Sequence, residues 1–303
     1  MRSPDFFIVG APKCGTTSLY TYLADHPDVF MPAIKEPHFF YAGSPTFPEV
    51  RDYRRYIGLF GPAGPDQICG EASSCYFLSS HSVEAILGRF PNAKMVAMVR
   101  NPVDMIASFH HHKLYSFQED IRDLARAWAL SPERQVSGPI PPKCKAPEQL
   151  DYQAVAKLDH GLKAFMETVP ENQRLVIVFD DFVKDPADVF AKILDFLGLR
   201  SWQPEQFAKK NPRQVHRWPG LARTLMYPPF PLNVAKKGIK RALGPRLKQL
   251  GRRLYEWEAT PVRPAQLSDE LRETLARHLA PEIDLLEGLI GREFPGWRQA
   301  AAG

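Results

Sequence analysis

The residues best placed to do chemistry lie in a short loop near the N-terminus. An apolar run at 6–9 is long enough for one buried strand and ends at Gly10. The loop from Gly10 to Gly15 carries Lys13, and the three hydroxyl residues that follow suit the start of a helix. This order directs backbone N–H groups and a helix dipole toward an anion, usually a phosphate.

The glycine spacing resembles that of the nucleotide P-loop, with one residue displaced. In a nucleoside-triphosphate P-loop, lysine directly follows the second glycine and reaches the β- and γ-phosphates. Here Thr16 holds that position, and Lys13 precedes Gly15. The loop is therefore suited to hold a phosphate but poorly suited to transfer a γ-phosphoryl group. A plain glycine turn between a core strand and a helix is the alternative.

A second strand predicts another site for an anion. The apolar run at 94–99 ends in Arg100, and Pro102 suits the first turn of a helix that carries Ser108. A charged residue at the carboxyl end of a parallel strand lies at the ligand edge of an α/β sheet. Beside a phosphate loop, Arg100 and Ser108 are therefore expected to face an anion rather than only water.

Two other patterns in the sequence do not predict functional sites. The run His110, His111 and His112 does not predict a metal site, because successive helix positions point about 100° apart and cannot converge on one ion. A strand at 174–179 ends in Asp180 and Asp181, as in a Walker B strand. Capping of the turn before the next helix accounts for these acids.

Composition limits the class of protein. The chain has 303 residues, enough for one large α/β domain or two small ones, and a net charge of +5, which fits an anionic ligand without requiring nucleic acid. Its four cysteines show neither CxxC spacing nor disulfide density, so a cytoplasmic location is expected. No apolar run approaches the ~20 residues of a membrane span, and the first strand begins too early for a signal peptide.

The apolar periodicity predicts a P-loop-like parallel sheet flanked by helices, with further helical insertions. We expect one domain over 1–303 with a phosphate loop at 10–18. The predicted helices lie at 16–25, 50–60, 81–90, 102 onward, 121–130, 150–168, 186–197 and 268–290.

Four motifs in order resemble those of sulfotransferases that use 3'-phosphoadenosine 5'-phosphosulfate (PAPS). The resemblance is closest to the bacterial and heparan-sulfate-type branch and covers about 6–199. The motifs are the loop at 10–18, the segment Lys-Glu-Pro-His-Phe-Phe at 35–40, Arg-Asn-Pro at 100–102 with Ser108, and Phe-Leu-Gly-Leu at 196–199.

The resemblance implies how PAPS would be held, without a metal. Lys13 would neutralise charge on the bridging oxygen as the sulfuryl group leaves. Arg100 and Ser108 would bind the 3'-phosphate. Sulfuryl transfer resembles phosphoryl transfer in needing in-line positioning and charge neutralisation. The remaining donor-site residues implied by the first motif are Cys14, Gly15, Thr16, Thr17 and Ser18.

The acceptor hydroxyl must lose a proton, so the site needs a base. Glu36 matches the base of the heparan-sulfate branch, and Pro37 with neighbouring aromatic residues is expected to desolvate it and raise its pKa. An exposed loop carboxylate is the alternative. Other candidates for the base are His38, Glu71 and His110. Lys35, His38 and Glu71 are predicted to lie near the acceptor.

Two features depart from the family pattern. Heparan-type enzymes have lysine where this chain has Ala72, so a heparan-like acceptor is not expected. The family also carries a late basic loop that closes over the 3'-phosphate, and 211–217 is the candidate, with Arg217 or Arg213 as the contact.

A basic helical insertion is expected at about 221–258. Residues 236–253 contain eight Lys or Arg and no acid, with leucines at helical spacing. Such a helix can contact an anionic membrane, although a core-facing leucine stripe is the commoner arrangement.

The sequence thus predicts sulfuryl transfer to a hydroxyl, in preference to an amine, of a small molecule, sugar or lipid. A P-loop kinase of small molecules or nucleosides is the alternative. A non-catalytic nucleotide-binding or membrane-associated protein is a further one.

Overall fold

The computed structural model describes the chain except residues 1, 46, 208–213, 228–258, 262–266 and 299–303. The chain divides into two compact units, of which the larger carries the N-terminal loop. The larger unit comprises Met1–Leu114, Gln118–Lys210 and Leu267–Gly303, and the smaller comprises Tyr115–Phe117 and Asn211–Gln266. That the whole chain is one domain stays a prediction.

Five parallel strands form the sheet of the larger unit, in the order β2-β3-β1-β4-β5. Because every pair is parallel, the carboxyl ends of the strands meet at one edge, where ligands bind in open α/β sheets. Strands β1 and β4 are almost wholly buried, which explains their continuous apolar runs. The strands are β1 Phe6–Gly10, β2 Val29–Phe30, β3 Ile68–Ala72, β4 Lys94–Val99 and β5 Arg174–Val178.

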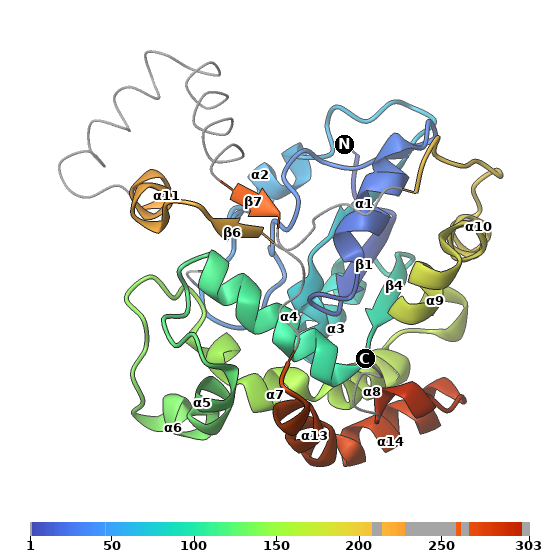
Figure 1. Cartoon of the computed structure of the whole chain (residues 1–303). Coiled ribbons are helices and arrows are strands. Elements are labelled where there is room, and N and C mark those ends of the chain that lie inside the picture. The colour runs from blue at the N-terminus through green and yellow to red at the C-terminus, as the bar shows by residue number, and fades with distance from the viewer. Residues whose placement is uncertain (1, 46, 208–213, 228–258, 262–266, 299–303) are drawn as a thin grey trace. The chain divides into compact units, whose positions relative to one another are not determined.

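Helices connect these strands and pack on the sheet or on one another, which confirms the predicted α/β fold class (Figure 1). The α-helices of the larger unit are α1 Thr16–Asp25, α2 Tyr53–Gly58, α3 Ser80–Arg89, α4 Pro102–Tyr115, α5 Leu124–Ala129, α6 Ser131–Val136, α7 Tyr152–Ala156, α8 Leu158–Thr168, α9 Phe179–Lys184, α10 Pro186–Leu197, α13 Asp269–His278 and α14 Ala280–Ile290. The 3-10 helices are η1 Ser74–Leu78, η2 Pro147–Leu150, η3 Glu171–Gln173 and η4 Pro295–Trp297.

Three predicted elements differ from the structure. The single helix expected at 150–168 is two helices that break at Lys157, and the helix expected at 268–290 breaks at Leu279. The second break has a local cause, because Pro281 in the first turn of α14 lacks the N–H that a continuous helix needs. Asp180 and Asp181 lie inside the short helix α9 rather than in a turn.

The smaller unit contains an antiparallel pair, β6 Gln214–His216 with β7 Ala259–Pro261, and the helix α11 Pro219–Met226. The His216 ring stacks on Tyr115, with centroids 4.2 Å apart. The predicted basic helix at 236–253, and with it most of the insertion at 221–258, lies outside the described residues.

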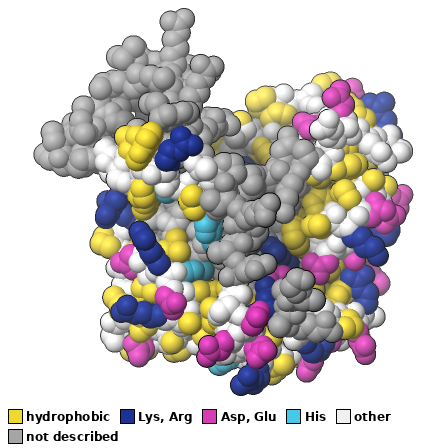
Figure 2. All heavy atoms as spheres, in the orientation of Figure 1, with side chains coloured by type: hydrophobic (Ala, Val, Ile, Leu, Met, Phe, Trp, Pro, Cys, Tyr) yellow, Lys and Arg dark blue, Asp and Glu magenta, His cyan; other side chains and the backbone are white. Residues whose placement is uncertain are grey.

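The described surface mixes charges of both signs. On the face seen in Figure 2, Lys and Arg side chains are interspersed with Asp and Glu side chains. Among the helices that the structure describes, none combines the length and the apolar character needed to cross a bilayer.

Candidate functional site

The loop between β1 and α1 has a backbone that its sequence explains. Gly15 caps α1 at φ 91°, a conformation that favours glycine, and a Cβ there would lie 2.8 Å from the Phe179 ring. No side chain caps this helix start. Lys13 also has a positive φ, 63°, which a non-glycine residue adopts only when its surroundings impose it. The predicted strand, loop and helix are confirmed, including the helix end at Asp25.

The predicted donor-site side chains differ in their access to a ligand. Thr17 and Ser18 are half-buried at the first turn of α1, whereas Thr16 is buried. The Cys14 thiol is fully buried and points to the Pro12 carbonyl at 3.4 Å. Burial raises the pKa of this thiol to about 12, against the opposing charges of Arg100 and Lys13. A ligand would therefore meet the hydroxyls of the first turn rather than the Cys14 thiolate.

Arg100 follows β4 directly and meets the loop that follows β1. Its Nη1 donates to the Lys13 carbonyl oxygen at 3.4 Å, and its guanidinium lies 4.7 Å from the centre of the Phe179 ring. This is the ring that a Cβ on Gly15 would strike, so Arg100 and the start of α1 share one neighbour. Ser108 lies further along α4 and is nearly buried. The two predicted anion sites are therefore adjacent at neighbouring strand ends.

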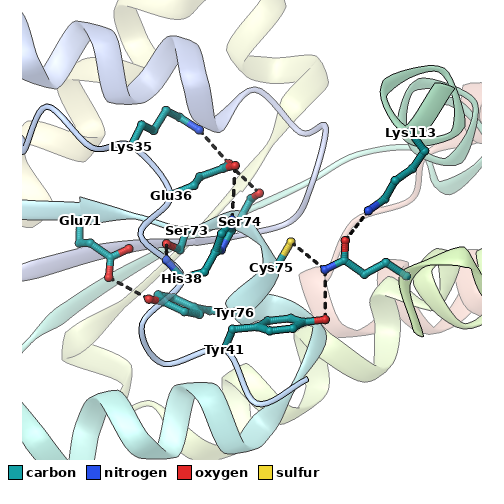
Figure 3. Close-up of polar contacts among 11 residues, drawn as sticks. Lys35, Glu36, His38, Tyr41, Glu71, Ser73, Ser74, Cys75, Tyr76 and Lys113 are labelled. Atoms are coloured by element: carbon teal, nitrogen blue, oxygen red, sulfur yellow. Dashed lines mark hydrogen bonds and ion pairs between the residues drawn. The ribbon is translucent and has the colours of Figure 1, made fainter. Parts of the chain in front are cut away.

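Glu36 lies in a tight turn after β2 and is the centre of a polar cluster (Figure 3). Lys35 Nζ lies 2.8 Å from Glu36 Oε1, and Ser74 Oγ donates to the same oxygen at 3.0 Å. His38 Nε2 lies 3.6 Å from the other oxygen, Oε2. Both Glu36 (φ 60°) and His38 (φ 53°) occupy the left-handed region. Such strain, here in two residues of one turn, is typical of functional sites.

The expected rise in the pKa of Glu36 is wrong. Desolvation does oppose its ionisation, but the Lys35 ammonium and the His38 ring outweigh this and hold the pKa of Glu36 well below its usual range. The side chain is also 35% exposed, so its neighbours do not enclose it fully. Glu36 is therefore ionised at neutral pH and able to accept a proton.

The segment after β3 holds the Glu36 turn, which the sequence did not predict. The Glu36 N–H donates to the Ala72 carbonyl at 3.0 Å, and the His38 N–H donates to Ser73 Oγ at 3.1 Å. Ser74 adds the side-chain contact to Glu36. The sequence singled out this segment only as a departure from the family pattern, and the two adjacent serines were the available signal.

Glu71, predicted to lie beside the acceptor, has a buried side chain that bonds within the core, and its role at the acceptor stays a prediction. Its side chain is fully buried, and the hydroxyls of Tyr56 and Tyr76 each donate to Oε2 at 3.0 Å. Burial raises the pKa of Glu71 to about 7, although Ser73 and the two tyrosines oppose the rise. Glu71 is a buried carboxyl that is bonded to the hydroxyls of Tyr56 and Tyr76.

The histidines separate into three roles. His38 is buried and its ring packs on Phe47, with centroids 4.5 Å apart. His110, one of the alternative candidates for the base, contacts the Ile121 carbonyl at 2.8 Å and is buried, and its role as a base stays untested. His112 reaches solvent, yet desolvation by the surrounding protein and the charge of Lys13 lower its pKa to about 3.

A pocket of about 400 Å³ opens beside Glu36. It brings Lys35, Glu36 and His38 together as predicted, and adds Phe47 and Lys145, which the sequence did not single out. A second pocket shares Phe47 and Lys145 with the first. The first pocket is lined by Ala33, Ile34, Lys35, Glu36, His38, Phe47, Glu49, Gln118 and Lys145.

Lys113, Tyr41 and Cys75, labelled in Figure 3, all contact one buried amide, that of Gln149. Gln149 Oε1 accepts from the buried ammonium of Lys113 at 2.6 Å, and its Nε2 donates to Tyr41 Oη at 3.1 Å and to Cys75 Sγ at 3.6 Å. Tyr41 in turn donates to Glu148 at 2.8 Å. These contacts join α4, η2 and η1 to the chain between His38 and Phe47.

Comparison with known proteins identifies the family. Residues 3–213 match the family model described as "Sulfotransferase domain", which is more than half of the chain. The chain belongs to the PAPS-dependent sulfotransferase family. A solved member, "Crystal Structure of Sulfotransferase from Alicyclobacillus acidocaldarius", is 26% identical with a TM-score of 0.69, and the match covers 99% of this chain and all of that one.

Curated members of the sulfotransferase family match over part of their length. Heparan sulfate glucosamine 3-O-sulfotransferase 6 of Mus musculus is 31% identical over 205 residues, which are 66% of this chain and 53% of the relative. Carbohydrate sulfotransferase 15 of Homo sapiens is 25% identical over 274 residues, covering 71% and 48%. The chain therefore spans about half the length of the curated relatives it matches.

The acids after β5 in this sulfotransferase-family chain have structural partners. Trp297 Nε1 donates to Asp180 at 2.7 Å, and Arg292 pairs with Asp181 at 2.9 Å. These contacts fasten the C-terminal end of the chain to α9, and they account for both acids without the Walker B function of a kinase. Arg217 is exposed and belongs to the smaller unit, so its contact with the 3'-phosphate stays a prediction, while Arg213 lies outside the described residues.

Proposed function

We propose that the chain transfers a sulfuryl group from PAPS to a hydroxyl of a sugar or another small molecule. One observation carries this proposal. At the same edge of the sheet, a lysine-bearing loop adjoins the guanidinium of Arg100, and an ionised Glu36 lines a pocket. Family membership supports PAPS as the sulfuryl donor.

The residues of the donor side fit a nucleotide with phosphates at the 3' and 5' positions of its ribose. The start of α1 has no side-chain cap and bears Thr17 and Ser18, so its amides and hydroxyls would bind the 5'-phosphate. Arg100 and Ser108 would bind the 3'-phosphate. Gly15 lets the loop pack against Phe179, the ring beside Arg100, since a Cβ there would strike that ring. When bound, PAPS supplies the sulfuryl group.

On the acceptor side, Glu36 would take the proton of the attacking hydroxyl. The new bond joins the acceptor oxygen to sulfur, and the bond between sulfur and the 5'-phosphate oxygen breaks. Lys13 would neutralise the negative charge that grows on that leaving oxygen. Because Glu36 is ionised at neutral pH, it needs no prior deprotonation to act as the base.

The pocket favours a polar acceptor larger than a simple alcohol. It presents cations, acids and one aromatic ring, and it continues into the second pocket through Phe47 and Lys145. The named curated relatives act on heparan sulfate glucosamine or on carbohydrate. Here Ala72 is buried, and its carbonyl is bonded to the Glu36 amide. We therefore propose a sugar or small-molecule hydroxyl rather than a heparan-like chain.

A transfer assay tests this function. The purified chain is incubated with sulfur-labelled PAPS and a panel of monosaccharides, phenols and primary alcohols, in parallel with labelled ATP and magnesium. We expect label transfer from PAPS that is insensitive to chelators and at least about 10²-fold slower in Glu36→Gln. Transfer from ATP but not from PAPS would replace this proposal with a kinase.

A further inference from the structure

The two oxygens of the Glu36 carboxylate have different surroundings. Oε1 receives both Lys35 Nζ at 2.8 Å and Ser74 Oγ at 3.0 Å. Among the described residues, His38 Nε2 approaches Oε2 at 3.6 Å, which is beyond ordinary hydrogen-bond distance. A proton arriving at this carboxylate therefore meets less competition at Oε2 than at Oε1.

The position of Ser74 beside Glu36 Oε1 is fixed by its surroundings. It is only 6% exposed and begins η1, directly after the strand β3. The preceding residue, Ser73, binds the sheet through its amide, which donates to the Ile8 carbonyl at 3.1 Å. The Ser74 hydroxyl is thus fixed to the core of the larger unit, whereas Lys35 belongs to the same turn as Glu36.

We propose that Ser74 is a positioning residue for sulfuryl transfer, whose hydroxyl binds Glu36 Oε1 and leaves Oε2 to receive the acceptor's proton. This inference rests on the proposed function, in which Glu36 is the base.

Removing the Ser74 hydroxyl should change the pKa of Glu36 in a defined direction. A donor to the charged form of a carboxyl lowers its pKa, so Ser74→Ala should raise the pKa of Glu36. The acidic limb of the kcat/KM profile should then move to higher pH. The other titratable or charged groups that act on Glu36 stay in place, namely Lys35, His38, Glu71, Cys75 and His112.

The experiment compares Ser74→Ala with Ser74→Thr, which keeps a hydroxyl, and with Ser79→Ala as a matched control. Ser79 lies in the same segment, and its side chain makes no capping hydrogen bond to α3. The Glu36 carboxyl is followed by carbon-13 NMR across pH, which needs no acceptor. The pH profile of kcat/KM is measured with the best acceptor of the panel.

We expect Ser74→Ala to raise the Glu36 titration midpoint and to lower kcat/KM about tenfold or more, as for a hydrogen bond to a charged group. Ser74→Thr and Ser79→Ala should match the wild type, and all variants should bind 3'-phosphoadenosine 5'-phosphate (PAP) equally. An unchanged titration in Ser74→Ala would refute the contact. A raised titration with unchanged kcat/KM would refute the positioning role. Full activity in Glu36→Gln would instead remove the proposed base itself.

Discussion

The proposed donor side and the proposed acceptor side of the site are built in different ways. The proposed donor side consists of one contiguous loop at 10–18 after β1, Arg100 at the end of the adjacent strand β4, and Ser108 on the helix that follows. The acceptor side collects residues from the turn after β2, the end of β3, α4 and η2. The proposed donor side thus joins one loop to the end of the neighbouring strand, whereas the proposed acceptor side depends on contacts among more segments.

This difference decides what variation each side tolerates. The donor loop depends on backbone positions, since Gly15 is held against Phe179 and Lys13 has a positive φ. The acceptor side depends on side-chain hydrogen bonds that reach Glu36 and Gln149 from elsewhere. Substitutions on the acceptor side should therefore change acceptor use while leaving PAP binding intact, and the following variants test that separation.

The largest effect is expected from Glu36→Gln. The amide cannot accept a proton, so kcat should fall by about 10²- to 10⁴-fold, the usual contribution of a general base. PAP affinity, measured by calorimetry, should stay within twofold of the wild type. A parallel loss of PAP affinity would show that the two sides are not separate.

Lys13→Ala should lower kcat by about 10²- to 10³-fold, as expected when a group that stabilises developing charge is lost. Lys13→Arg keeps the charge and is the matched comparison, with a smaller loss expected. Single-turnover kinetics with labelled PAPS would separate this effect from substrate binding. Equal activity of both variants and the wild type would show that Lys13 has no part in the chemistry.

Glu71→Gln should alter stability rather than chemistry. The pKa of Glu71 is raised in the folded chain from an ordinary 4.5 to about 7, so the folded state prefers the protonated form. Wild-type stability should fall as pH rises from 4.5 to 7, by roughly 3 kcal/mol, and the variant should lack this loss. Urea unfolding at pH 5 and pH 8 measures it. The same pH dependence in both proteins would contradict a buried, neutral Glu71.

The smallest effect is expected from Phe47→Ala. Removing the ring that packs on His38 and lines both pockets should raise the acceptor KM by about tenfold, with kcat/KM for PAPS unchanged at saturating acceptor. Phe196→Ala, at the end of α10, is a matched control. If both variants affect the acceptor KM equally, the pocket is not the acceptor site.

The sequence predicted local elements well. The helix α1 could be bounded because Gly15 and the pair His26-Pro27 stand at its two ends. The sequence could not show that Glu71 is buried, because its surroundings include Tyr56 and Tyr76 from other elements. The contact between Ser74 and Glu36 also joins distant segments, so it could not be predicted from the sequence. The pKa of Glu36 is lowered rather than raised because Lys35 and His38 act on its carboxylate.

Calorimetry of PAP against adenosine 5'-phosphate tests the central claim most directly, because the two ligands differ only in the 3'-phosphate. We predict that the wild type prefers PAP by about 10- to 100-fold, as for one charge-assisted contact, and that Arg100→Ala loses this preference while its affinity for adenosine 5'-phosphate is unchanged. Equal affinity of the wild type for both ligands, or an undiminished preference in Arg100→Ala, would contradict the account.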